Sequence, residues 1–174
     1  NGFIVVALFG NYVDHIVKPT FEISLISLIF GIAPIFIDAQ YSDSIRMKKN
    51  VELHLQKGSR LKATDNIDGY IRPCNMINDP KTALIGNPVT GKPSFVFIYG
   101  YEADSCTISG EGIIDANGHA FVERKDKYYV TGNFYPRPTV IYVEKSNNIT
   151  FKDVTIVDAP FWTLHPAGCD DVLI

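Results

Sequence analysis

Five residues in the second half of the chain have side chains suited to acid–base chemistry or ligand binding. Asp170 and Asp171 form a paired carboxylate, the kind of pair that general acid–base catalysis uses. They precede a short apolar run, as Asn147 and Asn148 do earlier in the chain. We therefore predict a turn at Asp170 and Asp171 and not a catalytic pair. Arg137 could hold a ligand carboxylate with two parallel hydrogen bonds or form a structural ion pair. Trp162, near His165, could stack on a sugar ring or pack as an aromatic residue at a corner of the fold.

The cysteines and the remaining histidines do not have the spacing of a metal site. Cys74, Cys106 and Cys169 form no CxxC or Cys/His pattern. His54 and His119 are isolated, with no partner at ligand spacing. We therefore expect no metal, no other cofactor and no disulfide framework.

Composition and charge narrow the class of protein. The chain has 174 residues, of which 46% are hydrophobic and 20% charged, with a net charge of −3, as in an ordinary folded protein. The basic cluster at Arg46, Lys48 and Lys49 is short and is expected to be a solvated strand end, so nucleic acid is not an expected partner.

The apolar segment Phe21–Ile37 contains a glycine and a proline and is short for a membrane span. We expect a buried helix followed by a strand there, no signal peptide and no membrane partner.

Short strand-like runs recur along the chain. Val51, Cys106, Ile149 and Val172 begin four of them, at intervals of 55, 43 and 23 residues, and each run follows a polar residue. Two runs continue into a second apolar pair, and Ile113 and Ile156 each lie 7 residues after the start of theirs. A period near 23 with no helical pattern is typical of a solenoid. We therefore predict an all-β fold, a right-handed parallel β-helix, in preference to a β-sandwich or leucine-rich repeats.

The solenoid hypothesis fixes which segments form coils and which side chains face inward. We assign 44–174 to the coils and 1–43 to a divergent apolar cap or first coil. The longer intervals predict insertions near Tyr70–Lys92 and Gly118–Pro138, where several prolines lie. Asp115, which precedes an Asn-Gly pair, is expected in a structural turn. The inward column is predicted to contain Leu53, Ile108, Phe151 and Leu173, or their neighbours.

Four segments together resemble one family. Ser44–Ala63 is similar to the first coils of glycoside hydrolase family 28, the polygalacturonases and their relatives. Ile108–Gly118 resembles the family's "I-x-G-x-G-T-I-D-G-N-G". Arg137-Pro138 and the stretch from Asn148 to Pro166 resemble its "R-P … N-V-x-I … S-P-x-W-x-x-H-P". The four segments occur in the family's order, so the chain is similar to its amino-terminal portion.

The resemblance implies a function that the residues alone do not. It implies hydrolysis of α-1,4-linked galacturonic acid in pectin with inversion and without a metal, by a monomeric protein that is extracellular or periplasmic. The family's catalytic motifs are absent here and are expected beyond Ile174, so this chain alone is expected to be inactive. Arg137, Trp162 and His165 are the candidate substrate-binding residues. The alternatives are a polysaccharide-binding β-helix without catalysis, as in tailspikes or adhesins, and a pectate lyase.

Overall fold

The computed structural model describes residues 4–8, 40–73, 92–121 and 136–174, and within them the strands form three parallel sheets. Sheet A contains β1 (Ile4–Leu8), β4 (Val51–Leu55), β7 (Thr107–Ser109), β10 (Asn147–Lys152) and β13 (Asp170–Leu173). Sheet B contains β3 (Ile45–Met47), β6 (Val96–Tyr101), β9 (Thr139–Glu144) and β12 (Leu164–Ala167). Sheet C contains β2 (Gln40–Ser42), β5 (Arg60–Ala63), β8 (Ile113–Asp115) and β11 (Thr155–Val157). Two short 3-10 helices, η2 (Ile67–Gly69) and η3 (Gly118–Ala120), follow strands of sheet C.

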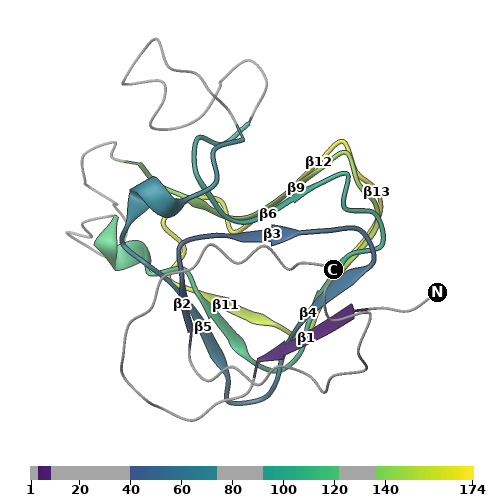
Figure 1. Ribbon diagram of the computed structural model, residues 1–174, viewed down its shortest axis with the longest axis horizontal. Helices are drawn as coiled ribbons and strands as arrows, with labels where there is room; N and C mark the ends of the chain where they lie inside the picture. The colour runs from purple at the N-terminus through teal and green to yellow at the C-terminus, as the bar shows by residue number, and fades with distance from the viewer. Residues whose placement is uncertain (1–3, 9–39, 74–91, 122–135) are drawn as a thin grey trace.

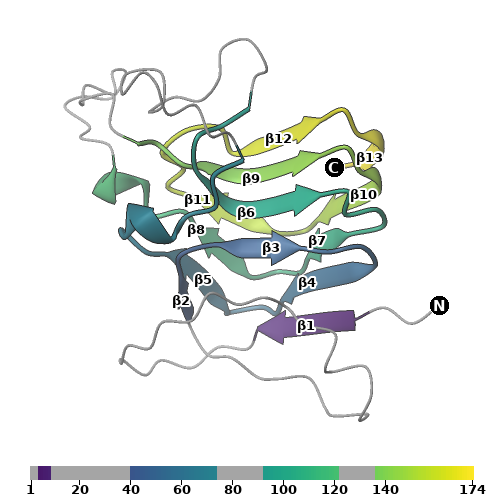
Figure 2. The ribbon, with the colours of Figure 1, turned by 45° about the horizontal axis from the view of Figure 1, so that its top comes forward.

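The chain winds through the sheets in a fixed order. Each coil passes from sheet A to sheet C to sheet B, and every strand pairs in parallel with its counterparts in the adjacent coils. In Figure 1 this path runs clockwise while the coils recede from the viewer, and Figure 2 shows them stacked from β1 to β12. Clockwise and receding means right-handed, the usual sense for parallel crossovers. The predicted right-handed parallel β-helix is confirmed.

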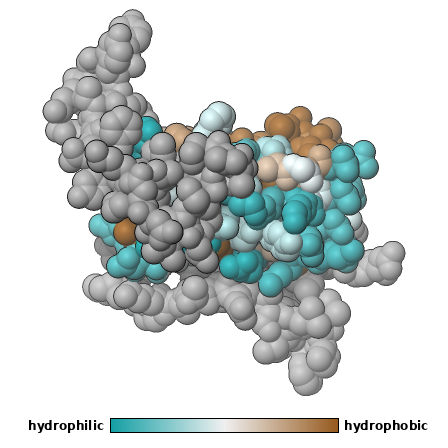
Figure 3. Space-filling model, turned by 90° about the horizontal axis from the view of Figure 1, so that it is seen from above, coloured by the Kyte–Doolittle hydropathy of each residue, from teal (hydrophilic) through white to brown (hydrophobic). Residues whose placement is uncertain are grey.

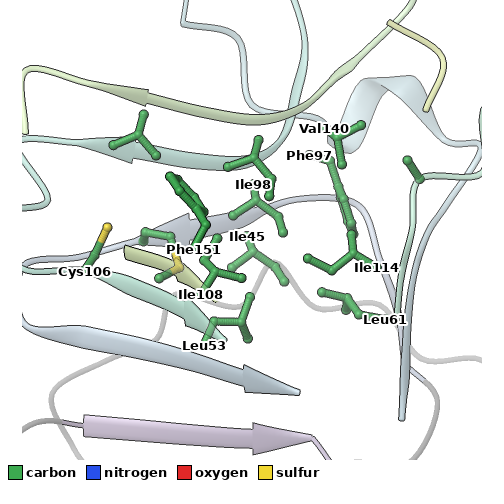
Figure 4. Packing of buried hydrophobic residues seen from close by; sticks show 14 of the residues in the cluster. Ile45, Leu53, Leu61, Phe97, Ile98, Cys106, Ile108, Ile114, Val140 and Phe151 are labelled. Atoms are coloured by element: carbon green, nitrogen blue, oxygen red, sulfur yellow. The ribbon is translucent and has the colours of Figure 1, made fainter. Parts of the chain in front are cut away.

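The inward side chains form apolar columns along the axis. Leu53, Ile108 and Phe151 are partners in register, all three are buried, and they line up in Figure 4. Leu173 does not belong to this column: it pairs with Thr150 and its side chain is 62% exposed. Side chains alternate between faces along a strand, so a shift of one residue moves Leu173 to the outer face. The inward residue of β13 is its neighbour Val172, which packs against the core, as the prediction allowed.

One spacing argument was wrong. The intervals of 55, 43 and 23 residues between coils match the observed register, but the equal offsets of 7 residues within coils do not. Ile113 lies opposite Thr155, and it is Ile114 that lies opposite Ile156. The turn between β7 and β8 has one residue more than the turn between β10 and β11. The equal offsets of 7 therefore compared residues on different faces of sheet C.

The corners between sheets B and A depend on residues in the left-handed backbone region. Asn50, Ser105, Asn148 and Asp171 occupy the same place in successive coils, with φ of 59°, 55°, 56° and 53°. Asn and Asp tolerate this region better than most residues, because their short side chains bond locally. The Asn148 side-chain amide donates to the Ser105 hydroxyl, 3.1 Å away. Asp171 thus has the geometry of a corner residue.

The insertions and the amino-terminal region are described in part. The two long connections, from β5 to β6 and from β8 to β9, leave the same corner between sheets C and B, but 74–91 and 122–135 lie outside the described residues. The expected helix within Phe21–Ile37 also lies outside them. β1 and β2 fall before residue 44 and extend sheets A and C. No helix among the described residues is long and apolar enough to cross a membrane.

Candidate functional site

The outer face of sheet B carries a ladder of aromatic and cationic side chains. Arg46, Tyr99, Tyr142 and His165 are register partners on β3, β6, β9 and β12. The Arg46 guanidinium lies 5.2 Å from the Tyr99 ring centre. The Tyr99 and Tyr142 rings stack at 5.9 Å with 8° between their planes, and His165 lies 5.0 Å from Tyr142. Figure 3 looks onto this face, where hydrophilic residues predominate among those coloured.

A buried carboxylate holds this ladder in place. Glu144 is 3% exposed and accepts hydrogen bonds from the hydroxyls of Tyr99 (2.6 Å) and Tyr142 (3.3 Å), and the Lys92 ammonium lies 2.7 Å away. Burial opposes ionisation of Glu144, but the hydrogen bonds from Lys92 and Tyr99 outweigh it and hold its pKa below the usual value. Burial, followed by the bond to Glu144, raises the pKa of Tyr99. Tyr99 is therefore a neutral donor, and Glu144 holds both tyrosine rings by their hydroxyls.

A second group of side chains continues the ladder along the edge of sheet B. The Arg137 guanidinium lies 4.9 Å from the Phe161 ring centre, and Phe161 and Trp162 meet edge to face at 5.8 Å. Trp162 lies 5.7 Å from His165 and is 57% exposed. Figure 1 shows β12, which follows this segment, on the same side of the solenoid as β6 and β9. The exposed indole gives this edge an apolar surface to which a ligand ring can bind.

Two nitrogen atoms of this edge are buried and have no hydrogen-bond partner within the part of the chain that the structure describes. They are Nε of Arg137 and Nδ1 of His165. Burial also lowers the pKa of His165, so its imidazole is neutral at pH 7. A buried polar atom without a partner costs free energy, and such atoms are rare in folded proteins.

The structure brings the three predicted substrate-binding residues together. Arg137 and His165 lie at opposite ends of the contact chain that passes through Phe161 and Trp162. Among the described residues Arg137 has a ring contact and no ion pair with a carboxylate, and the choice between a ligand carboxylate and a structural ion pair stays a prediction. Trp162 is exposed and also packs on Phe161 and His165, so its stacking on a sugar ring stays a prediction.

The sequence analysis missed the members of the ladder on β3, β6 and β9. Arg46 was assigned to a solvated strand end, but it covers a tyrosine ring. Tyr99, Tyr142 and Glu144 were not singled out at all. Tyr99 lies 43 residues from Tyr142 and 45 from Glu144, so only the register of the coils relates it to them.

The isolated histidines have partners that no local pattern indicates. His54 lies 2.7 Å from the Ser109 hydroxyl in the next coil, and His119 lies 2.6 Å from a carboxylate oxygen of Asp158. Asp115 is buried at 4% exposure, pairs with Arg60 at 2.6 Å, and accepts a hydrogen bond from a backbone N–H two residues on, as a turn residue does.

The cysteines and the potential metal ligands form no site among the described residues. Cys106 and Cys169 are free thiols, and Cys74 lies outside the described residues. Burial raises the pKa of Cys106 to about 11, which keeps it a protonated core residue. Among the residues that the structure describes, no three His, Cys, Asp or Glu side chains gather as metal ligands would.

Comparison with known proteins points to one family. Residues 79–174, more than half of the chain, match the family described as glycosyl hydrolases family 28. A proposed glycosyl hydrolase from Parabacteroides merdae ATCC 43184 has a similar crystal structure, with a TM-score of 0.54 and 22% identity, over 77% of this chain and 55% of that protein. A polygalacturonase from Erwinia carotovora ssp. carotovora gives 0.50 and 22%, over 70% of this chain and 33% of the enzyme.

At this level of identity the two structures establish the fold alone. The chain spans about half the length of the first and about a third of the second. No curated protein matches the sequence.

Proposed function

Because the chain belongs to glycosyl hydrolases family 28, we propose that it supplies substrate-binding coils of a polygalacturonase-type hydrolase that cleaves pectin, an α-1,4-linked galacturonan. The reaction is inverting: one carboxylic acid protonates the leaving oxygen and a carboxylate activates water on the opposite face of the sugar. We expect these groups in coils that follow Ile174. The protein acts outside the cytoplasm, as a monomer. The single observation that carries the proposal is the exposed Trp162 indole, which lies between the Arg137–Phe161 pair and His165.

The chemistry of this edge suits an acidic sugar. Each galacturonate unit presents a carboxylate, a ring face and hydroxyl groups. The Arg137 guanidinium is the residue type best shaped to hold a carboxylate, and its Nε has no hydrogen-bond partner among the described residues. The neutral imidazole of His165 bonds a sugar hydroxyl, and the Trp162 indole stacks on the ring.

The rest of the ladder orders this edge. His165 packs on Tyr142, which Glu144 holds by its hydroxyl. Because Tyr142 is 1% exposed, it serves as a fixed base for the imidazole and not as a sugar contact. Sugar units bind along the edge formed by Arg137, Trp162 and His165, where side chains remain open.

Tryptophan fluorescence tests the proposal directly, because Trp162 is the only tryptophan in the chain. Titration with hexagalacturonate is expected to change its emission in a saturable way. Arg137→Gln should weaken binding about tenfold, the effect of one charged hydrogen bond. Arg72→Gln is the matched control, since Arg72 covers a different ring, that of Phe95.

The charge of the ligand is the second control. Methyl-esterified hexagalacturonate keeps the ring and most hydroxyls but lacks the carboxylates, so it should bind the native protein about as weakly as hexagalacturonate binds the Arg137 variant. Equal binding of both ligands, or no response of the tryptophan to either, would refute the proposal.

A further inference from the structure

The outer face of sheet A carries a second set of polar side chains, away from the residues of the proposed substrate edge. Because Leu53 and Ile108 point into the core, their neighbours on β4 and β7 point outward. Glu52 therefore lies beside Thr107, and His54 beside Ser109, in adjacent coils. The sequence analysis assigned no role to these residues.

Three of these side chains form one hydrogen-bonded cluster. The Ser109 hydroxyl donates to Oε1 of Glu52 at 2.5 Å, and Nδ1 of His54 lies 2.7 Å from the same hydroxyl. Because the serine has a single proton and gives it to Glu52, the bond from His54 requires a proton on Nδ1. In the neutral imidazole, Nε2 is then an acceptor. This arrangement does not activate Ser109 as a nucleophile, because the lone pairs of the serine oxygen face the Nδ1–H donor of His54.

The cluster lies in an open hollow of about 530 Å³ that spans β4, β7 and β10. At its rim, Lys57 pairs with Glu111 at 3.3 Å, and Lys152 lies 4.0 Å from Asp153. These rim charges compensate one another. The floor thus presents the Glu52 carboxylate and the His54 ring, which are about one-third exposed or less.

Thr107 adds a hydroxyl without a partner. Its side chain lines the hollow and forms no hydrogen bond with the described residues, although it lies between Glu52 and the next coil. The hollow therefore combines a carboxylate acceptor, an imidazole acceptor and one hydroxyl. A ligand that donates several hydrogen bonds and has no negative charge fits this set, because an anion would meet the Glu52 carboxylate.

We propose that this hollow is a second carbohydrate-binding site, specific for an uncharged sugar unit. Two neighbouring hydroxyls of the sugar donate to Glu52 and to Nε2 of His54, and a third bonds Thr107. The site is open, so binding is weak, and it serves to hold a polysaccharide while another part of the protein acts on it. It shares no residue with the edge formed by Arg137, Trp162 and His165, so it does not rest on the proposed pectin substrate.

Calorimetric titration with uncharged hexasaccharides tests this site. Cellohexaose, mannohexaose and galactohexaose are the probes, and hexagalacturonate is the acidic comparison. At least one neutral probe should bind, without a change in Trp162 fluorescence and without competition from hexagalacturonate. Glu52→Gln should weaken that binding about tenfold. Asp68→Asn, which alters a carboxylate that is 88% exposed outside the hollow, should leave it unchanged.

A second variant guards against a folding defect. Thr107→Val removes only a hydroxyl that has no protein partner, so the fold should persist and the affinity should fall severalfold. The proposal is overturned if no neutral probe binds, if Thr107→Val and a folded Glu52→Gln bind like the native protein, or if the neutral probe competes with hexagalacturonate. Any of these results leaves the Trp162 titration unaffected, so the two proposals fail separately.

Discussion

Replacing Glu144 with alanine tests how the buried carboxylate supports sheet B. The change leaves the Lys92 ammonium and the Tyr99 hydroxyl, now 2.7 and 2.6 Å from the carboxylate, without their acceptor. Removing one partner of a buried ion pair costs about 3–5 kcal/mol. Because the Lys92 side chain is 32% exposed and regains water, we expect about 3 kcal/mol at pH 7. For a chain of this size that corresponds to a fall in Tm of roughly 6–12 °C.

Urea denaturation followed by circular dichroism measures the loss, and Glu111→Ala is the matched control. Glu111 forms an ion pair in which both side chains are more than half exposed, so its removal should cost less than about 0.5 kcal/mol. The pKa of Glu144 lies below its ordinary value of 4.5, so its contribution is present above that pH and is lost as the pH falls through the folded value. A cost under about 1 kcal/mol for Glu144→Ala, or the same cost for both variants, would refute the reasoning.

Three further predictions concern single residues. Because the pKa of His165 is lowered, its contribution to stability is present above pH 6.5 and is lost as the pH falls. The Tm of the native protein should therefore drop more between pH 7.5 and 5.5 than the Tm of His165→Leu does. Gly110→Ala places a Cβ 2.0 Å from a backbone oxygen at φ +103° and should cost more than about 3 kcal/mol, whereas Gly58→Ala, at φ +86° in open space, should cost about 1 kcal/mol in urea denaturation. Leu53→Ala should cost about 2–5 kcal/mol because it leaves a core cavity, and Leu173→Ala under about 1 kcal/mol.

The fold was readable from the sequence because its signals are local. Each coil repeats a polar residue before alternating apolar positions, and the intervals follow from counting. The error at Ile113 arose because two adjacent apolar residues look alike in a sequence, and the length of the preceding turn decides which one faces inward.

The site was readable only in part. Arg137, Trp162 and His165 stand out by residue type near the family-like segments. Tyr99 and Glu144 do not, because a tyrosine in a strand is ordinary and their hydrogen bond joins residues 45 positions apart. Once the register aligns β6 with β9, the stacked tyrosines and the buried carboxylate become visible together.

Mapping the bound oligosaccharide on isotope-labelled protein by NMR tests the central claim, that the edge of sheet B is the substrate-binding surface. With hexagalacturonate, we predict that the largest amide shift changes fall on Arg137, on Phe161–Trp162 and on β12, and that the outer face of sheet A stays unchanged. Shift changes concentrated on β4 and β7, or spread over all three sheets without a maximum near Trp162, would contradict the account.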